Sequence, residues 1–187
     1  MGGVRQHLPR RPPGRAGQGP GGEQRVSAPG APSPYPYTLR VATDPADIEA
    51  CFAVRKEVFV VEQGVAEELE YDGRDTAALQ VLAVRDDGLP LGTARLLYGP
   101  EAADRTGGDP ATGALGRLAV GRAARGLGIG AALVRAVEDA ARERGLTTVD
   151  LHAQSHALGF YERLGYTAYG PEFLDAGIAH RSMRRDI

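Results

Sequence analysis

From Tyr37 onward, apolar positions change between two periods, every second residue and every third or fourth residue. The segment Tyr37–Ala42 alternates as an edge strand does. Thr43 or Asp44 then caps a helix, because a side-chain oxygen satisfies free N–H groups there and Pro45 suits the first turn. An apolar stripe follows at helical spacing, and Gly64 ends the helix. The stripe consists of Ile48, Cys51, Phe52, Val54, Val58 and Phe59.

The rest of the chain continues as strands and helices separated by polar turns. Runs of apolar and β-branched residues between Gly, Pro or Asp predict strands, and apolar residues at helical spacing before a Gly predict helices. The predicted strands are Ala78–Arg85, Leu91–Tyr98, Ala114–Val120, Thr147–Ala153 and two short ones near Tyr166–Tyr169 and Ile178–Arg184. The predicted helices are Ala131–Arg144 and Ser155–Leu164, and the long polar loops are Glu67–Asp75 and Gly99–Gly113. Residues 37–187 therefore predict one globular domain of strands and helices.

Residues 1–36 differ from this domain, with eight Pro, eight Gly and five Arg and almost no large apolar side chain. Such a segment buries too little apolar surface to offset the entropy lost on ordering, so we expect a disordered basic tail. Three interpretations stay open: an arm for an acidic partner, a passive tail, and a start codon placed too far upstream.

Composition narrows the class of protein. Apolar residues make up 42% and charged residues 25% of the 187 residues, as in soluble globular proteins, and the formal net charge is −2. This charge gives no general attraction to nucleic acid or to an anionic membrane, and the apolar runs are too short to span a bilayer. A single cysteine, Cys51, lies on the apolar stripe and excludes an intramolecular disulfide or a multi-cysteine metal site. Because the N-terminus has no secretory signal pattern, these observations favour the cytoplasm.

A glycine-rich turn between a predicted strand and a predicted helix gives the strongest chemical signal. It runs from Leu118 to Gly130, with glycines at 126, 128 and 130 and arginines at 122 and 125. Glycine lets the backbone approach a ligand closely, and the first N–H groups of a helix have no partner within it. Together with the helix dipole and the arginines, these groups make an anion site suited to a pyrophosphate. A P-loop would need Gly-Lys-Ser/Thr, and a Rossmann fingerprint would come earlier in the chain, which leaves a plain strand-to-helix turn as the alternative.

The segment Arg125–Gly130 resembles the acyl-CoA-binding motif of the GNAT N-acetyltransferases, Arg-x-x-Gly-x-Gly. Downstream, Gln154, Ala157 and Phe160–Tyr166 are similar to the second signature of that family, with Gln in place of Asn and Tyr in place of Phe. Further segments are similar to the ElaA-like branch of the superfamily, and the matches together cover about residues 40–184. These segments are Val58–Gln63, Glu70–Asp75, Leu151–Gln154 and Gly177–His180.

The resemblance implies an α/β fold, with a mixed six- to seven-stranded sheet splayed between its fourth and fifth strands and helices on both faces. Acetyl-CoA would lie in the gap between Ala114–Val120 and Thr147–Ala153. Backbone groups of Leu118 and Val120 would pair with the pantetheine and steady the oxyanion, and Gln154 would hydrogen-bond the pantetheine or ribose. The implied cofactor-binding residues are Leu118, Ala119, Val120, Arg125, Gly126, Leu127, Gly128, Ile129, Gly130, Gln154 and Tyr161.

The resemblance also implies transfer of the acetyl group to a primary amine by direct attack in a ternary complex. An alkyl ammonium with a pKa of about 10 must lose a proton before it attacks, and the departing CoA thiolate needs one. Tyr161 occupies the family position of the general acid, and a core aromatic is the alternative. Glu62 is the candidate general base, and a solvated carboxylate at the helix end is the alternative.

The acceptor is expected to meet an acidic wall, because Glu70, Asp72 and Asp75 would attract a cationic amine. A solvated acidic loop is the alternative, and the spacing of these carboxylates is not that of a calcium loop. Three histidines are further candidates for a base or a substrate contact, with a structural role as the alternative: His152, His156 and His180. The predicted substrate-binding residues are Glu62, Glu70, Asp72, Asp75 and His152.

The expected partners are acetyl-CoA as cosubstrate and a small-molecule or peptide amine, with no metal, and a homodimer is common in this superfamily. One rival function is that of an acyl-homoserine-lactone synthase, whose N-terminal elements are similar to Arg55–Phe59 and Glu70–Asp75 but which lacks the Arg-x-x-Gly-x-Gly loop. The other rival is a CoA-binding sensor or interaction module that kept the fold and lost the chemistry.

Overall fold

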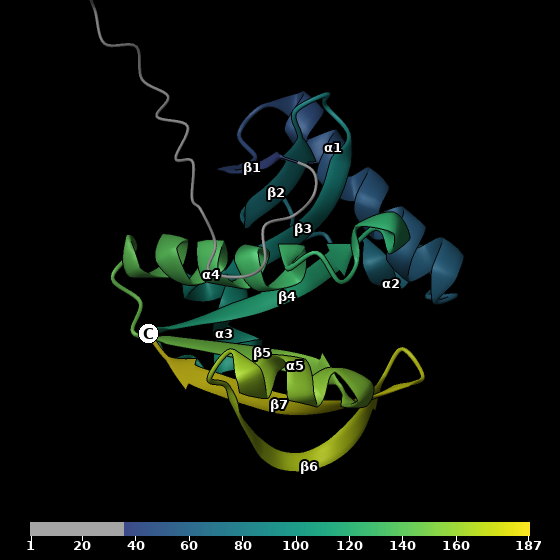
Figure 1. Ribbon diagram of the computed structural model, residues 1–187. Coiled ribbons are helices and arrows are strands. Elements are labelled where there is room, and N and C mark those ends of the chain that lie inside the picture. The colour runs from purple at the N-terminus through teal and green to yellow at the C-terminus, as the bar shows by residue number, and fades with distance from the viewer. Residues whose placement is uncertain (1–35) are drawn as a thin grey trace, which may run out of the picture.

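The computed structural model describes residues 36–187, so the expected tail, apart from Pro36, lies outside the described residues. Figure 1 shows a curved sheet with helices packed against it. The strands are β1 (Tyr37–Val41), β2 (Leu79–Arg85), β3 (Pro90–Leu97), β4 (Thr112–Val120), β5 (Thr148–Gln154), β6 (Thr167–Asp175) and β7 (Ile178–Asp186). The α-helices are α1 (Pro45–Arg55), α2 (Glu67–Glu70), α3 (Ala103–Thr106), α4 (Ile129–Arg142) and α5 (Leu158–Arg163).

The seven strands form one mixed sheet in the order β1-β2-β3-β4-β5-β7-β6. Every pairing is antiparallel except that of β4 with β5, which is parallel. The parallel pairing spans only four residue pairs, from Thr112 with Thr148 to Leu115 with Leu151. Beyond them β4 continues to Val120 and β5 to Gln154 without pairing to each other. The expected mixed sheet, splayed between its fourth and fifth strands, is confirmed.

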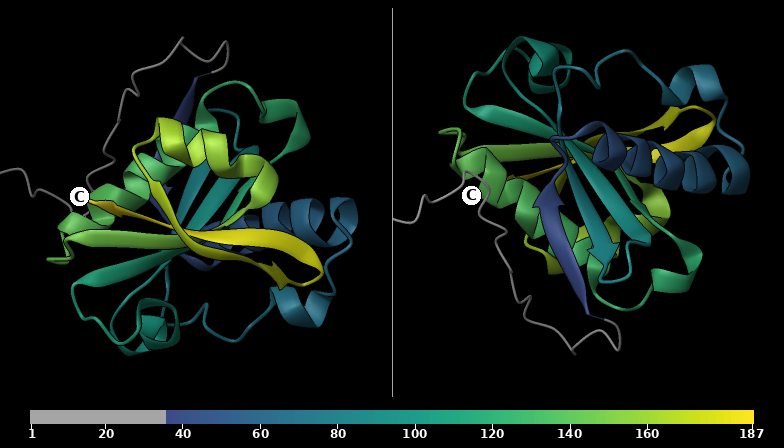
Figure 2. Two further views of the ribbon diagram at one scale, coloured as in Figure 1. Left: turned by 90° about the horizontal axis from the view of Figure 1, so that it is seen from below. Right: turned by 90° about the horizontal axis from the view of Figure 1, so that it is seen from above.

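Helices cover both faces of the sheet, as Figure 2 shows. On one face α4 contributes Leu133 and Val137, which are fully buried in the main core. Burying each such side chain stabilises the fold by about 1.5–3 kcal/mol. On the other face α1 places Cys51 against Leu82, so Cys51 belongs to the core as expected. No helix within residues 36–187 is long and apolar enough to cross a membrane.

The first helix begins where its capping signal predicts and changes type before it ends. Asp44 is the cap, because its Oδ1 accepts a hydrogen bond of 2.8 Å from the N–H of Asp47. After α1 the chain continues as a π-helical segment, Lys56–Glu62, before Gly64 takes a φ of 71°. Turns of π-helix are rare in proteins, and those that do occur are frequently found at functional sites. This segment turns its last residues toward the splayed strands.

Three expectations about loops and strand lengths were wrong. The acidic loop contains α2, and the Gly-rich loop contains a 3-10 turn, Gly99–Ala102, followed by α3. The last two strands are also longer than expected, with nine residues each. All residues of β6 are exposed or half-buried at the sheet edge, so no apolar alternation marks them. A two-residue turn with positive φ at Ala176 (48°) and Gly177 (77°) joins β6 to β7, as in tight hairpins.

Candidate active site

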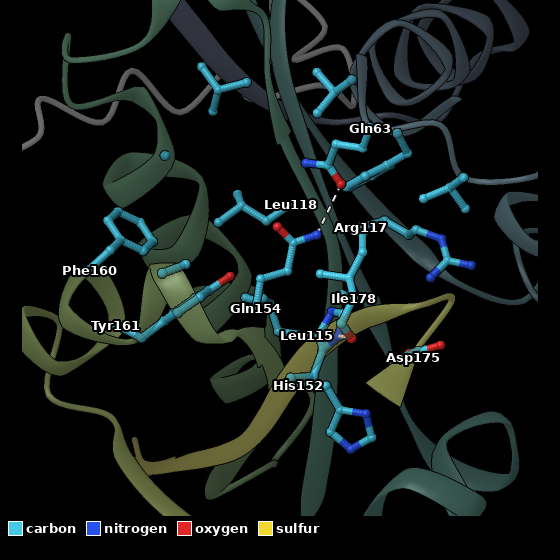
Figure 3. A pocket seen from close by; sticks show the side chains of 18 of the residues that line it. Gln63, Leu115, Arg117, Leu118, His152, Gln154, Phe160, Tyr161, Asp175 and Ile178 are labelled. Carbon is cyan, nitrogen blue, oxygen red and sulfur yellow. Dashed lines mark hydrogen bonds between the residues drawn. The ribbon is translucent and has the colours of Figure 1, made fainter. Parts of the chain in front are cut away.

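A cavity of about 900 Å³ occupies the split between β4 and β5. Figure 3 shows Leu118 of β4, Gln154 of β5 and Tyr161 of α5 around it. The π-helical segment Lys56–Glu62, the loop before α4 and the β6–β7 turn close its remaining sides. On the side facing β5, the backbone of β4 beyond Leu115 has no strand partner. The cavity therefore offers an extended ligand an unpaired strand edge.

The split is shaped by a β-bulge in β4. The pairing of β3 with β4 shifts so that Ala94 lies opposite both Arg117 and Leu118, and Arg117 takes a φ of 52°. A left-handed conformation costs a non-glycine residue about 1 kcal/mol. The Arg117 side chain compensates, because its Nε lies 2.8 Å from Oε2 of Glu70 and its guanidinium donates to the carbonyl of Leu69. The bulge is thus held by contacts between Arg117 and residues of α2.

The glycine-rich loop presents a row of free donors to the cavity. Gly126 and Gly128 both have a φ of 78°, and Gly128 precedes α4 without a side-chain cap. Within the described residues, no hydrogen bond reaches the N–H groups of Gly126–Ala131. Such N–H groups, at the positive end of a helix dipole, bind anionic oxygens. The loop therefore has the geometry of a pyrophosphate site.

Tyr161 lies in α5 at the wall of the cavity. Its ring is 7% exposed and packs edge-to-face against Phe160 and Tyr166. Figure 3 shows its hydroxyl pointing into the cavity, where no described residue hydrogen-bonds it. Burial raises the pKa of Tyr161 well above the ordinary value of about 10. The phenol is therefore protonated at neutral pH and free to donate.

Glu62 does not stand as an isolated carboxylate. It forms a two-pronged ion pair with Arg125, with N–O distances of 2.7 and 2.8 Å. Arg125 also donates from Nε to the carbonyl of Val120 at 3.0 Å. The hydrogen bonds from Arg125 lower the pKa of Glu62 below its ordinary range. This weakens Glu62 as a proton acceptor, and its visible role is to hold Arg125 beside the loop.

The acidic residues of the expected substrate wall are neutralised by arginines. Arg55, fully buried at the end of α1, donates from Nε to Glu70 and from NH1 to Asp75 at 2.6 Å. Its guanidinium also reaches Gln80 and the carbonyl of Glu70, so all its nitrogens have partners. Glu70 itself is only 2% exposed.

Asp72 completes this cluster from the other side. Arg95 donates to both Asp72 oxygens, at 2.8 and 2.6 Å, and to Asp75 at 3.0 Å. Burial alone would raise the pKa of Asp72, but the hydrogen bonds and charge of Arg95 outweigh it and hold that pKa far below the usual range. We call Arg55, Glu70, Asp72, Asp75, Arg95 and Arg117 the acid–arginine cluster. It is a charge-balanced support beneath the β4 bulge, so three arginines offset the carboxylates of the expected acidic wall, and the attraction of this wall for a cationic amine stays a prediction.

The cluster predicts that substitutions at two adjacent residues, Arg55 and Lys56, have very different effects on the stability of the protein. Replacing Arg55 with methionine should lower the free energy of unfolding by about 3 kcal/mol, because buried Glu70 and Asp75 lose a compensating charge. Lys56→Met is the matched control, since Lys56 pairs with Glu67 on the surface and both side chains are about half exposed. Urea unfolding of both variants measures the difference. Equal midpoints would contradict the supporting role of the cluster.

The lone pair on Nδ1 of His152 already accepts a hydrogen bond. Its Nδ1 lies 2.8 Å from NH1 of Arg105, and an arginine can only donate, so Nδ1 accepts and the neutral ring carries its proton on Nε2. Burial, and then the charge of Arg105, lower the pKa of His152. The ring also packs edge-to-face against Phe173. His152 is therefore a poor general base in this arrangement.

His180 has the opposite tautomer. Its Nδ1 lies 2.8 Å from the carbonyl oxygen of Ile178, which can only accept, so Nδ1 donates and Nε2 carries the lone pair. Phe173 stacks on this ring and fixes its plane. His180 lies directly opposite Gln154 across the β5–β7 pairing, and both residues line the cavity. A proton acceptor therefore stands beside the open end of β5.

The structure brings most of the expected site residues together but not all. Three do not line the cavity: Ala119 packs on Val54 and Val58, Leu127 contributes to the core, and Asp75 belongs to the acid–arginine cluster. Several cavity residues had no role assigned from sequence, among them two polar ones. Arg105 lies in a segment expected to be a loop, and Gln63 accepts a 3.0 Å hydrogen bond from Gln154 across the cavity (Figure 3).

The comparisons with known proteins agree with this geometry. A family model described as the acetyltransferase (GNAT) domain matches residues 43–187, so the chain belongs to the GNAT acetyltransferase family. YyaT of Bacillus subtilis (strain 168), an uncharacterised protein, is 35% identical over 150 residues, which cover 79% of this chain and 94% of YyaT.

Solved structures agree as well. An acyl-CoA N-acyltransferase from Pseudomonas aeruginosa is 33% identical with a TM-score of 0.67, and the match covers 81% of this chain and 99% of that chain. Escherichia coli ElaA is 24% identical with a TM-score of 0.67, covering 81% and 99%, and this likeness concerns the fold. The expected superfamily is confirmed, and ElaA is among the structural neighbours. The oligomeric state and the cellular compartment stay predictions.

Proposed function

We propose that this chain transfers the acetyl group of acetyl-CoA to a primary amine by direct attack within a ternary complex. One observation carries the proposal: the free N–H groups of Gly126–Ala131, the unpaired edge of β4 and the Tyr161 hydroxyl all border one cavity. An anion site, a slot for an extended amide chain and a proton donor are the three features that an acyl-CoA thioester requires.

The loop and β4 would do the binding. The N–H groups of Gly126–Ala131 hydrogen-bond pyrophosphate oxygens, and Arg125, held by Glu62, adds charge beside them. The β4 edge pairs with the amides of the pantetheine. A β4 amide near Leu118 then donates to the thioester carbonyl and stabilises the oxyanion that forms on attack.

Tyr161 and His180 would handle the two protons. The Nε2 lone pair of His180 accepts the proton of the incoming ammonium, directly or through water, because Glu62 is engaged by Arg125. Tyr161 donates its proton to the departing thiolate. Burial raises the pKa of the phenol, so Tyr161 keeps its proton at neutral pH until the thiolate departs.

The test is amine-dependent release of free CoA, followed by detection of the thiol and by mass spectrometry of the product. Acetylated amine formed in proportion to CoA supports the proposal. Tight acetyl-CoA binding without turnover on any amine would favour the sensor or interaction module. Turnover of long-chain acyl donors in preference to acetyl-CoA would favour the lactone-synthase-like alternative.

If the loop is the anion site, substituting a glycine at the N-terminal end of α4 should weaken acetyl-CoA binding, and substituting one at the C-terminal end should not. Gly128 and Gly145 have φ values of 78° and 75°, and a Cβ at either would meet no atom within 4 Å. Valine should therefore strain both positions alike. Gly128→Val should weaken acetyl-CoA binding by about tenfold to 100-fold, the loss of one charge-assisted hydrogen bond, while Gly145→Val leaves it unchanged. Calorimetry measures both, and equal affinities would sink the loop assignment.

A further inference from the structure

The cavity has a second end, away from the glycine-rich loop. Figure 3 shows His152 and Asp175 on the side opposite Phe160. Charged residues from three separate segments meet at this end: Arg74 before β2, Arg105 in α3 and Asp175 at the β6–β7 turn. Since the loop and α5 define the cofactor end, this second end is where an acceptor would enter.

The arginines at this end are not equivalent. Arg74 is neutralised by a two-pronged ion pair with Asp104, at 2.7 and 2.8 Å. Arg105 has no carboxylate within 4.0 Å among residues 36–187, and its guanidinium hydrogen-bonds only the His152 ring. A guanidinium has five N–H donors, so most of those on Arg105 remain available. Arg105 is therefore a cavity cation without a counter-ion.

Asp175 provides the opposite charge. It is exposed and lines the same cavity, and its carboxylate has no hydrogen bond or ion pair with any residue in the described range. The tight turn at Ala176 and Gly177 fixes its position at the end of β6. An uncompensated cation and an uncompensated anion thus face one acceptor space.

We propose that the acceptor is an amine that also bears a carboxylate, as an amino acid does, with the carboxylate bound by Arg105 and the ammonium attracted by Asp175. The inference rests on the proposed function and names its substrate class. Guanidinium and carboxylate match as a two-pronged, charge-assisted pair. A carboxylate carries one negative charge, which balances Arg105, whereas a phosphate would leave excess negative charge beside Asp175.

The test uses acceptor pairs that differ only in the carboxylate, such as phenylalanine and 2-phenylethylamine, or β-alanine and ethylamine. The kcat/KM of each is expressed per concentration of neutral amine, so that the differing amine pKa values do not bias the comparison. We expect the carboxylate member to be favoured at least about tenfold, the range of one charge-assisted hydrogen bond. Ethanolamine and its phosphate ester form a third pair that distinguishes phosphate from carboxylate.

Variants of Arg105 then test whether this residue causes the preference for acceptors with a carboxylate. Arg105→Gln should abolish it by lowering kcat/KM for the carboxylate members alone, and Arg105→Glu should reverse it. Arg142→Gln is the control, because Arg142 pairs with Asp139 on the outer side of α4, outside the cavity. Thermal unfolding of each variant verifies the fold.

The outcomes separate this inference from the proposed function. No acetylation of any amine defeats the proposed function itself. Acetylation with equal kcat/KM for both members of each pair, or an equal loss for both in Arg105→Gln, overturns the inference and leaves Arg105 as a support for His152. A preference for the phosphate ester over the amino acids overturns the assignment to a carboxylate.

Discussion

Replacing Tyr161 with phenylalanine should lower kcat by about ten- to a thousand-fold, around the usual contribution of one general acid. The ring and its contacts with Phe160 and Tyr166 remain, and only the hydroxyl that points into the cavity is lost. Because no described residue hydrogen-bonds that hydroxyl, stability and acetyl-CoA affinity should barely change. Steady-state kinetics, calorimetry and thermal unfolding on the same preparation measure all three.

The acyl donor provides the control for this assignment. A thioester whose thiol has a low pKa leaves without assistance, so the deficit of Tyr161→Phe should shrink with such a donor. A core tyrosine would behave differently, because its loss would affect stability and would be indifferent to the leaving group. Wild-type kcat in the variant, with chemistry rate-limiting, would exclude Tyr161 as the acid.

Replacing His180 with glutamine should lower kcat/KM by about 100-fold at neutral pH. Glutamine retains a polar side chain but cannot take up a proton, so the ammonium must lose its proton to solvent. The deficit should therefore narrow as the pH rises toward the amine pKa of about 10, where the neutral amine forms without help. The deficit of Tyr161→Phe should not narrow in this way. The two pH profiles, recorded with one acceptor, separate base from acid.

Two further variants compare His180 with its rivals. Glu62→Gln removes the carboxylate that Arg125 holds, and we expect it to weaken acetyl-CoA binding more than it lowers kcat. His156→Gln changes an exposed histidine of the same cavity and should alter kcat/KM by less than about twofold. A pH-independent loss in His180→Gln, or a larger loss in Glu62→Gln at saturating acetyl-CoA, would return the base to Glu62.

The cofactor end of the site could be predicted from the sequence because its features are local. Glycines at 126, 128 and 130 are consecutive in the chain, and a strand before them and an amphipathic helix after them are visible as patterns. The backbone supplies the donors there, so little depends on tertiary contacts. The runs of apolar and β-branched residues in β2 to β5 predicted the central strands for the same reason.

The charge pairing at the acceptor end could not be predicted, because it depends on residues far apart in sequence. The acids of Glu67–Asp75 are visible as a group, but their partners Arg55, Arg95 and Arg117 come from a helix and two strands. Arg105 lies in a segment whose small and polar residues lack a helical apolar stripe. Tautomers likewise follow from contacts between side chains and backbone that no sequence pattern encodes.

The four-pair contact between β4 and β5 has a consequence for amide hydrogen exchange. Protection of a backbone amide follows from its hydrogen bond, and the centre of a sheet is ordinarily its slowest region. Here the pairing ends at Leu115 and Leu151, so amides of β4 that point across the split toward β5 should exchange rapidly although they lie in the middle strand of seven. A band of rapidly exchanging amides through an otherwise protected sheet would mark the position where a strand could add to β4.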